Sequence, residues 1–306
     1  MKILVSGGAG FIGSHVADAL LKKGHEVHII DNLTGGFKHN VPKEATFYEM
    51  DIRDEHVEKI WADENFSVLY HLAAQMDVRK SVADPKFDAD VNVKGFLNLM
   101  EAGRKNGLKK TIFSSTGGAI YGEPVYAPQD EDHPLKPLSP YGITKRVSEL
   151  YLYFYEQTHG IDWISLRYGN VYGPRQSPHG EAGVIAIFTE RMLQNEQAFI
   201  NGDGKQTRDY VFVQDVVQAN LKALDHKEND IFNVGTGTET DVETLFQEIQ
   251  RLTETTVDQK HADAKPGEQQ RSVLSTKKIE QELGWQQKYT IKEGLHETVS
   301  WFADKQ

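Results

Sequence analysis

The glycine spacing near the start of the chain constrains the fold more strongly than any other feature. Residues 3–5 form a short apolar run that predicts a β-strand, and Gly7, Gly10 and Gly13 follow it directly. Residues 11–23 then place apolar side chains on one helical face and predict a helix. Glycines between a strand and a helix permit a tight turn, backbone approach to a pyrophosphate and close helix–strand packing. The opening therefore predicts a dinucleotide-binding βαβ unit.

Strand-like and helix-like segments alternate through the first half of the chain, which is the pattern of a doubly wound, parallel sheet. The expected strands are residues 3–5, 27–30, 47–50, 68–72, 111–113 and 163–167, and the expected long helices are residues 88–106 and 141–158. After residue 175 glycines, prolines and polar loops interrupt this pattern. We therefore expect an α/β Rossmann domain at 1–175 and a smaller C-terminal substrate-binding lobe at 176–306, with residues 210–235 returning to the first domain.

Composition excludes several classes of function. The 306 residues carry a formal net charge of −11, which argues against a nucleic-acid partner because no basic stripe is available to neutralise phosphates. The sequence has no cysteine, and its twelve histidines show no metal-ligand spacing, so no metal is expected. We find no signal-peptide core and no apolar run long enough to cross a bilayer. These observations predict a cytoplasmic protein without a membrane partner.

Tyr141 and Lys145 lie four residues apart just after Ser139-Pro140, so they share one face of the predicted helix. An ammonium beside a phenol favours the phenolate and lowers the tyrosine pKa from its reference of about 10. A dinucleotide site combined with such a tyrosine base is typical of alcohol–ketone redox chemistry. The same spacing also occurs by chance on surface helices, so the interpretation depends on its context.

Asp31 lies 18 residues after Gly13, at the end of the second predicted strand. A carboxylate at this position accepts hydrogen bonds from the adenosine ribose and repels a 2′-phosphate, which favours NAD over NADP. Asp51 and Ile52 follow the third predicted strand and are candidate adenine contacts, although an aspartate there is also a common turn residue.

The chain resembles the extended short-chain dehydrogenase/reductase family and, within it, the nucleotide-sugar 4-epimerases of the UDP-glucose 4-epimerase type. The resemblance covers nearly the whole length. It is carried by GGAGFIGSH at 7–15, DNL at 31–33, DIRD at 51–54, HLAAQ at 71–75, FSST at 113–116, YGITK at 141–145, LRYGNVYGP at 166–174 and TRDYVFV at 207–213.

The resemblance implies a role for each matching residue. Tyr141 would be the acid and base, Lys145 would bind the nicotinamide ribose, and Thr116 would complete a catalytic triad in place of the more usual serine. The NAD site would comprise Gly7, Gly10, Phe11, Ile12, Gly13, Asp31, Asn32, Asp51, Ile52, Leu72, Ala73, Ala74, Asn92, Ser114, Tyr141, Lys145 and Tyr168. The UDP-sugar site would comprise Thr116, Tyr141, Asn170, Arg208, Glu268 and Ser272.

The residues after Thr116 narrow the expected reaction. Dehydratases of the family have an Asp-Glu pair there and UDP-glucuronate decarboxylases have a glutamate, whereas this chain has Gly117 and Gly118, which cannot transfer protons. This leaves 4-epimerisation through a transient 4-keto sugar, and we expect both glycines to leave room for the sugar to turn. A UDP-glucuronate epimerase or decarboxylase, a dehydratase and a non-catalytic NAD-binding regulator remain as alternatives.

Two further expectations concern the substrate and the assembly. Ser272 aligns with a bulky tyrosine of the epimerases that are restricted to glucose and galactose, so the small side chain predicts that 2-acetamido sugars are also accepted. The two long predicted helices carry more apolar residues than one sheet face requires, which predicts a homodimer. Those residues are Val91, Val93, Phe96, Leu97, Leu99, Met100, Leu150, Tyr151, Leu152, Tyr153 and Phe154.

Overall fold

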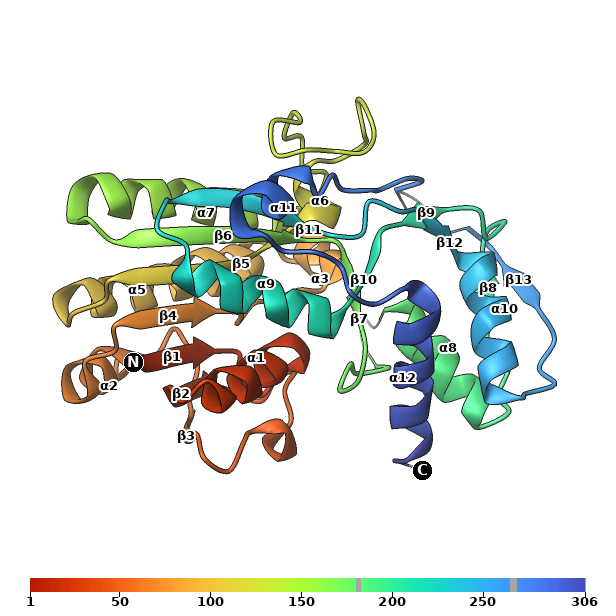
Figure 1. Ribbon diagram of the computed structural model, residues 1–306, viewed down its shortest axis with the longest axis horizontal. Helices are drawn as coiled ribbons and strands as arrows, with labels where there is room; N and C mark the ends of the chain where they lie inside the picture. The colour runs from red at the N-terminus through yellow and green to blue at the C-terminus, as the bar shows by residue number, and fades with distance from the viewer. Residues whose placement is uncertain (180–182, 265–268, 306) are drawn as a thin grey trace.

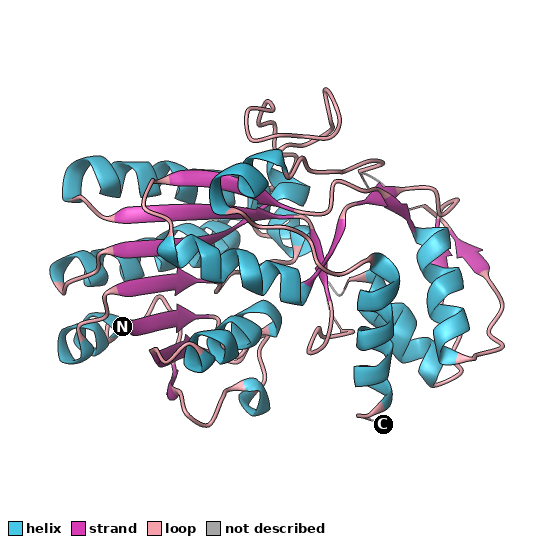
Figure 2. Ribbon diagram, in the orientation of Figure 1, coloured by secondary structure: helices cyan, strands magenta, loops and turns pink. Residues whose placement is uncertain are grey.

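Seven parallel strands form the central sheet in the order β11-β6-β5-β4-β1-β2-β3 (Figures 1 and 2). The computed structural model describes residues 1–179, 183–264 and 269–305. The strands are β1 (Lys2–Ser6), β2 (Glu26–Asp31), β3 (Thr46–Glu49), β4 (Val68–His71), β5 (Lys110–Thr116), β6 (Asp162–Tyr168) and β11 (Asp230–Val234). The strand order reverses direction between β1 and β4, and ligands of such sheets bind at the carboxyl ends of the strands near this point. The predicted doubly wound fold is confirmed.

Helices cover both faces of the sheet, because successive strand residues point to opposite sides. In β1, Ile3 and Val5 belong to one buried cluster and Leu4 to the other. The first cluster lies under α1 (Phe11–Lys22), α9 (Val213–Asp225) and α11 (Lys277–Leu283), and Figure 1 shows α1 and α9 in front of the strands. The second cluster lies under α2 (Val57–Glu64), α5 (Phe96–Lys105) and α7 (Pro140–His159).

A smaller lobe stands beside the carboxyl ends of the strands, at the right of Figure 1. It has its own apolar core, to which Phe188, Phe246 and Leu295 contribute. Its elements are α8 (Val184–Leu193), β8 (Phe199–Asn201), β9 (Thr207–Arg208), β12 (Thr240–Asp241), α10 (Val242–Thr253), β13 (Lys260–Ala262) and α12 (Ile291–Ala303). A parallel pair, β7 (Asn170–Tyr172) and β10 (Tyr210–Phe212), lies between the lobe and the sheet.

The helix expected over residues 88–106 is present as an unbroken helical run, but its hydrogen-bond pattern changes within it. After α3 (Val78–Ala83), the chain forms α4 (Pro85–Ala89), then a π-helical turn η2 (Asp90–Gly95), and only then α5. Single π-turns inside helices are rare and occur frequently at functional sites. Two short segments complete the elements, the 3-10 turn η1 (Lys38–Asn40) and the helix α6 (Gly117–Ile120). Within the described ranges, no helix has the length and apolar character that a bilayer crossing requires.

Candidate active site

Tyr141 and Lys145 lie in the first two turns of α7, where Ser139 caps the helix by accepting a hydrogen bond from the backbone of Gly142 at 3.2 Å. Pro140 occupies the first helical position, where its missing N–H costs no intrahelical bond. The Lys145 Nζ donates to the carbonyl oxygen of Ser114 at 2.7 Å. The helix start thus holds the lysine against the carboxyl end of β5.

Thr116 is the last residue of β5 and the N-cap of α6. Its Oγ1 accepts a hydrogen bond from the backbone N–H of Ala119 at 3.2 Å, and the same hydroxyl still has a proton to donate. In the sheet register Thr116 lies opposite Tyr168 of β6. Tyr168 is buried, and its hydroxyl is hydrogen-bonded to the side chain of Asn220. Thr116 and Tyr168 therefore lie side by side at the carboxyl ends of their strands.

The electrostatic expectation for Tyr141 is wrong in this structure. Burial raises the pKa of Tyr141 above its ordinary value of 10.0, and the negative charge of Asp88 raises it further. Burial lowers the pKa of Lys145 to about 8, against the opposing effects of Asp88 and Glu149. The physical reason is geometric: the ammonium points to the Ser114 carbonyl, and its Nζ lies 5.9 Å from the centre of the Tyr141 ring.

The glycine-rich loop packs tightly against the segment that follows β4. A methyl group on Gly7, whose φ is +75°, would lie 2.6 Å from the backbone nitrogen of Ala73, and one on Gly13 would lie 2.1 Å from the Gly7 carbonyl oxygen. The N-cap of α1 is Gly10, which has no side chain to cap the helix. The backbone N–H groups at this helix start can therefore approach an anion. The structure brings Gly7, Gly10, Phe11, Ile12, Gly13, Leu72, Ala73 and Ala74 together in this part of the molecule.

Asp31 ends β2 and contacts the same loop. Its carboxylate accepts hydrogen bonds from the backbone N–H groups of Ala9 at 3.0 Å and Leu33 at 2.8 Å. Burial raises its pKa, although both hydrogen bonds oppose the shift. Asp31 therefore fixes the conformation of the glycine-rich loop, and its carboxylate lies beside that loop.

Asn32 and Asp51 are also neighbours, since the Asn32 amide donates to Asp51 at 2.9 Å. The Arg53 guanidinium forms two hydrogen bonds with Asp51 and lowers the pKa of this carboxyl to about 2. Ile52 is buried, and a methyl group on Gly95 of the π-turn would lie 2.7 Å from it. Asn32 and Asp51 are thus linked to each other, and the buried Ile52 packs against the π-turn.

Asn92 lies in the π-turn and is buried. Its side-chain amide pairs with the backbone of Gln75, accepting from the nitrogen at 2.8 Å and donating to the oxygen at 2.9 Å. Asn92, a predicted cofactor residue, therefore joins the segment after β4 to the π-turn in which Asn92 lies.

A completely buried carboxylate lies behind this contact, and no sequence pattern singles it out. Asp88 accepts hydrogen bonds from Gln75 Nε2 at 3.0 Å, Asn92 Nδ2 at 3.1 Å and Thr144 Oγ1 at 2.9 Å. It joins the segment after β4 to the turn of α7 between Tyr141 and Lys145. A lone aspartate among helix residues has no spacing signal that would have revealed this.

The predicted sugar-nucleotide residues lie where β7, β9 and the segment 270–275 approach one another. The backbone nitrogen of Ser272 donates to the carbonyl of Thr207 at 3.2 Å, which places Ser272 beside Arg208. The backbone nitrogen of Asn170 donates to the carbonyl of Asp209 at 2.7 Å. Glu268 lies outside the described residues.

The two glycines after Thr116 have different environments, which corrects the expectation that both leave space for the sugar. A methyl group on Gly117 would lie 2.5 Å from the buried side chain of Leu274, so Gly117 serves packing. A methyl group on Gly118 would meet only Asn170 Oδ1 at 3.7 Å and Thr116 Oγ1 at 4.0 Å. Gly118 alone faces the predicted substrate residues.

Sequence comparison now identifies the family. The sequence model described as the NAD dependent epimerase/dehydratase family matches residues 3–235. The chain belongs to this family.

Three solved structures resemble this NAD dependent epimerase/dehydratase family member over essentially the whole chain. The UDP-glucose 4-epimerase of Thermotoga maritima with UDP-glucose is 47% identical, with a TM-score of 0.98 and coverage of 100% of this chain and 99% of that one. The UDP-glucose 4-epimerase of Thermus thermophilus in complex with NAD is 44% identical, with a TM-score of 0.93 and 99% coverage of both chains. The UDP-N-acetylglucosamine 4-epimerase of Methanobrevibacter ruminantium in complex with UDP-N-acetylmuramic acid is 35% identical, with a TM-score of 0.94 and coverage of 100% and 99%.

The residues of this family member fit the family's cofactor, NAD. The uncapped start of α1 and the close packing of Gly7 and Gly13 leave backbone N–H groups available to a pyrophosphate. The carboxylate of Asp31 suits ribose hydroxyls and disfavours the extra phosphate of NADP.

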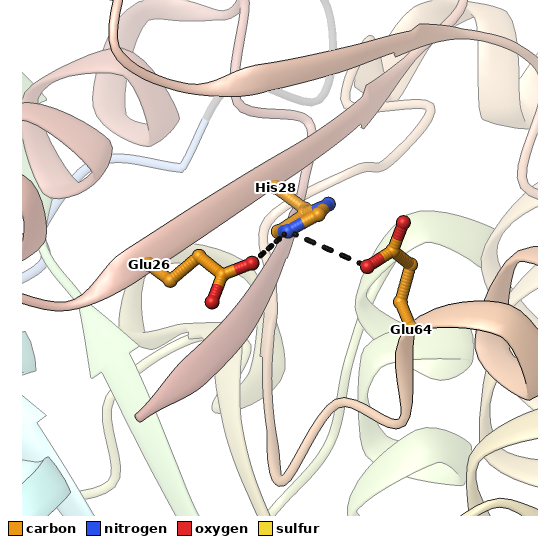
Figure 3. A group of neighbouring side chains, drawn as sticks. All are labelled: Glu26, His28 and Glu64. Atoms are coloured by element: carbon orange, nitrogen blue, oxygen red, sulfur yellow. Dashed lines mark hydrogen bonds and ion pairs between the residues drawn. The ribbon is translucent and has the colours of Figure 1, made fainter.

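One group with metal-ligand side chains lies elsewhere in the molecule (Figure 3). His28 Nε2 lies 3.0 Å from Glu26 and 3.9 Å from Glu64, at the amino end of β2 and therefore far along the strand from Asp31. The ammonium of Lys2 already pairs with Glu64 at 2.8 Å and with Glu26 at 3.4 Å. Because this cation already pairs with both carboxylates, we assign no ligand to the group.

Proposed function

We propose that this protein catalyses the NAD-dependent 4-epimerisation of a UDP-sugar, interconverting UDP-glucose and UDP-galactose. One observation carries the proposal: Thr116 ends β5, Lys145 is hydrogen-bonded to Ser114 of the same strand, Tyr141 lies one turn before Lys145 on α7, and no acid or base directly follows Thr116. The high similarity to epimerases over the full chain supports the same reaction.

Each residue of the triad has a defined task in this proposal. When bound, NAD accepts the hydride from C4 of the sugar and later returns it. Tyr141 takes the proton of the 4-hydroxyl as this hydride leaves and gives a proton back after the sugar has turned. Thr116 holds the sugar oxygen by a hydrogen bond. Lys145 holds the nicotinamide ribose.

The remaining predicted residues hold the two ligands. In the proposal, the loop at Gly7–Gly13 binds the pyrophosphate of NAD and Asp31 binds its adenosine ribose. Asn170 and Arg208 bind the diphosphate of the UDP-sugar, the arginine by charge-assisted hydrogen bonds. The substrate lobe then comprises residues 176–306 apart from the segment 210–235, which includes β11 and α9, and apart from α11, which packs on the sheet.

The environment of Gly117 and Gly118 favours epimerisation over the two lyase alternatives. A dehydratase or decarboxylase would need a carboxylic acid directly after Thr116. At Gly117 even a methyl group would overlap Leu274, so a longer side chain would require the buried Leu274 side chain to move. Gly118 presents no side chain between Thr116 and Asn170, which suits a sugar ring that must present both faces.

Three finer points, on the range of sugars, the assembly and the location, complete the proposal. The small side chain of Ser272 beside Arg208 supports acceptance of UDP-GlcNAc and UDP-GalNAc. A stripe on α7, formed by Ile143, Leu150 and Phe154, is 45–53% exposed and supports a homodimer through this helix. Phe96, Leu99, Met100 and Leu152 are buried within the subunit instead. The absence of cysteine supports a cytoplasmic location.

The decisive experiment incubates the purified protein separately with UDP-galactose, UDP-GlcNAc and UDP-glucuronate and identifies the products by proton NMR, with and without added NAD. We expect UDP-galactose to give its 4-epimer, and Tyr141→Phe to lose activity by about 10²–10⁴-fold while it keeps the fold. Carbon dioxide release would indicate a decarboxylase, and a 4-keto-6-deoxy product would indicate a dehydratase. Full activity of Tyr141→Phe would favour a non-catalytic NAD-binding protein.

A further inference from the structure

Asp209, which links β9 to β10, is almost completely buried, with 1% of its surface exposed. Its Oδ1 accepts hydrogen bonds from the backbone nitrogen and the hydroxyl of Thr236, both at 2.7 Å. Its Oδ2 accepts from the backbone nitrogens of Gly237 and Leu274, both at 3.1 Å. One carboxylate therefore fastens together three segments that are far apart in the sequence.

The backbone around Asp209 is packed directly against it. A methyl group on Gly235 would lie 2.5 Å from Oδ2, and one on Gly169 would lie 2.9 Å from the carbonyl oxygen of Asp209. The same carbonyl accepts the hydrogen bond from the Asn170 backbone at 2.7 Å. This enclosure leaves no space for a larger side chain at position 209.

Two of the fastened segments carry the predicted residues Arg208 and Ser272, and the predicted Asn170 contacts Asp209 through the backbone. Arg208 precedes Asp209, and Asn170 is hydrogen-bonded to it through the backbone. Ser272 lies two residues before Leu274, on a segment that runs beside Thr207 through hydrogen bonds of 3.0 and 3.2 Å. The spacing of these three residues thus depends on the contacts that Asp209 makes.

We propose that Asp209 is a positioning residue for the nucleotide diphosphate site, holding Arg208, Asn170 and the segment of Ser272 at the separation that the ligand requires. This inference rests on the proposed function. It assigns Asp209 no contact with the substrate, because its carboxylate is fully used by protein donors.

The hydrogen-bond pattern also explains why an aspartate is needed. Each oxygen faces two donors, so four donors point at the carboxylate. An asparagine would place its NH₂ group against two of them, whichever way the amide turned. Asp209→Asn should therefore separate the segments whose donors the carboxylate binds.

The test compares Asp209→Asn with Asp215→Asn as a matched control. Asp215 is also completely buried and accepts backbone hydrogen bonds, from Lys288 at 3.0 Å and Tyr289 at 3.2 Å, but it lies on α9 away from the three predicted residues. The affinity of the NAD-loaded protein for UDP is measured by calorimetry. The kcat and KM for UDP-galactose and the Tm are measured alongside.

We expect Asp209→Asn to weaken UDP binding by about tenfold or more and to raise KM more than it lowers kcat. Asp215→Asn should lower the Tm comparably while its UDP affinity stays within about twofold of the parent protein. Thr236→Ala, which removes one donor but keeps the carboxylate, provides a milder variant if Asp209→Asn does not fold, and should weaken UDP binding by about two- to fivefold.

Unchanged UDP affinity in folded Asp209→Asn would overturn this inference but not the proposed function. If Asp209→Asn does not fold, unchanged UDP affinity in Thr236→Ala would do the same. A loss of UDP affinity in Asp215→Asn as large as that in Asp209→Asn would also overturn the inference. A parent protein that neither bound UDP nor converted UDP-galactose would overturn the proposed function and this inference together. The behaviour of the parent protein therefore separates the two failures.

Discussion

The carboxylate of Glu149 accepts two parallel hydrogen bonds from the guanidinium of Arg167, Nε to Oε1 at 2.9 Å and Nη2 to Oε2 at 2.8 Å. Both side chains are buried, and Ser115 donates to the same carboxylate at 2.8 Å. Glu149 lies one helical turn beyond Lys145 on α7, whereas Arg167 belongs to β6. The pair therefore fixes the helix that carries Tyr141 and Lys145 to the sheet beneath it.

Removing one partner of this pair should destabilise the protein strongly. Arg167→Met leaves the buried carboxylate of Glu149 with only the half-exposed Arg146, at 3.2 Å, as a cation partner, so we expect the free energy of unfolding to fall by roughly 3 kcal/mol. Urea denaturation measures the change. Arg251→Met provides the control, because Arg251 pairs with Glu248 on the surface, where such pairs contribute about 0–1 kcal/mol. Equal losses in the two variants would contradict the role of the buried pair.

The same pair predicts a loss of stability in acid. Burial opposes the ionisation of Glu149, but the hydrogen bonds and charge of Arg167 outweigh burial and lower its pKa below the ordinary value of 4.5. A carboxyl with a lower pKa in the folded state stabilises the protein above its unfolded pKa, and this contribution disappears as the pH falls through the folded value. Melting temperatures measured downward from pH 6 should therefore fall below about pH 4.5, and less steeply in Glu149→Gln than in the parent protein.

The charge of Asp88 should set the pH range of activity. Asp88 raises the pKa of both Tyr141 and Lys145. In Asp88→Asn both pKa values should fall, so both limbs of the profile of kcat/KM against pH should move to lower pH. Thr144→Val, which removes a hydrogen bond to Asp88 but no charge, should leave the limbs near their parent positions. If kcat/KM fell at every pH while both limbs stayed at their parent pH values, Asp88 would act through packing and not through its charge.

The size of residue 272 should control which sugars are accepted. Ser272→Tyr should lower activity on UDP-GlcNAc by about tenfold or more relative to UDP-galactose, because the ring would occupy the space for the acetamido group. Ser272→Ala should keep both activities. Competition between the two substrates, followed by NMR, measures the ratio of the activities on UDP-GlcNAc and UDP-galactose. An unchanged ratio in Ser272→Tyr would show that the size of residue 272 does not control which sugar is accepted.

The exposed stripe on α7 should be the dimer contact. Leu150→Glu combined with Phe154→Glu should weaken association by at least about tenfold, since carboxylates would replace apolar contacts. Light scattering across a concentration series measures the association. Val125→Glu is the control, because Val125 is 65% exposed but lies in a loop away from α7. A parent protein that stayed monomeric at micromolar concentration would refute the dimer.

The strands and the glycine loop could be predicted from sequence because their signals are local. An apolar run followed by Gly7, Gly10 and Gly13 specifies a turn whatever lies further along the chain. The π-turn at Asp90–Gly95 could not be predicted, since it accompanies tertiary hydrogen bonds between Asn92 and Gln75. No periodicity in the sequence encodes that contact.

The candidate site was predictable as a set of residue types but not in its electrostatics. The spacing of Tyr141 and Lys145 suggested a lowered tyrosine pKa, whereas burial and Asp88 raise it. The roles of Asp88 and Asp209 could not be predicted from the sequence. A buried carboxylate is recognised by the hydrogen-bond donors around it, and these donors come from distant segments. The packing role of Gly117 depends in the same way on Leu274, more than 150 residues away.

The position of β11 in the sheet has a consequence for attempts to divide the molecule. β11 pairs with β6, and α9 covers one face of the sheet, yet both follow the first entry of the chain into the smaller lobe. A fragment that stopped at residue 175 would leave the edge of β6 unpaired and the apolar surface under α9 exposed to water. Such a fragment should aggregate on expression, and the gene therefore offers no simple point at which the two lobes could be exchanged between relatives.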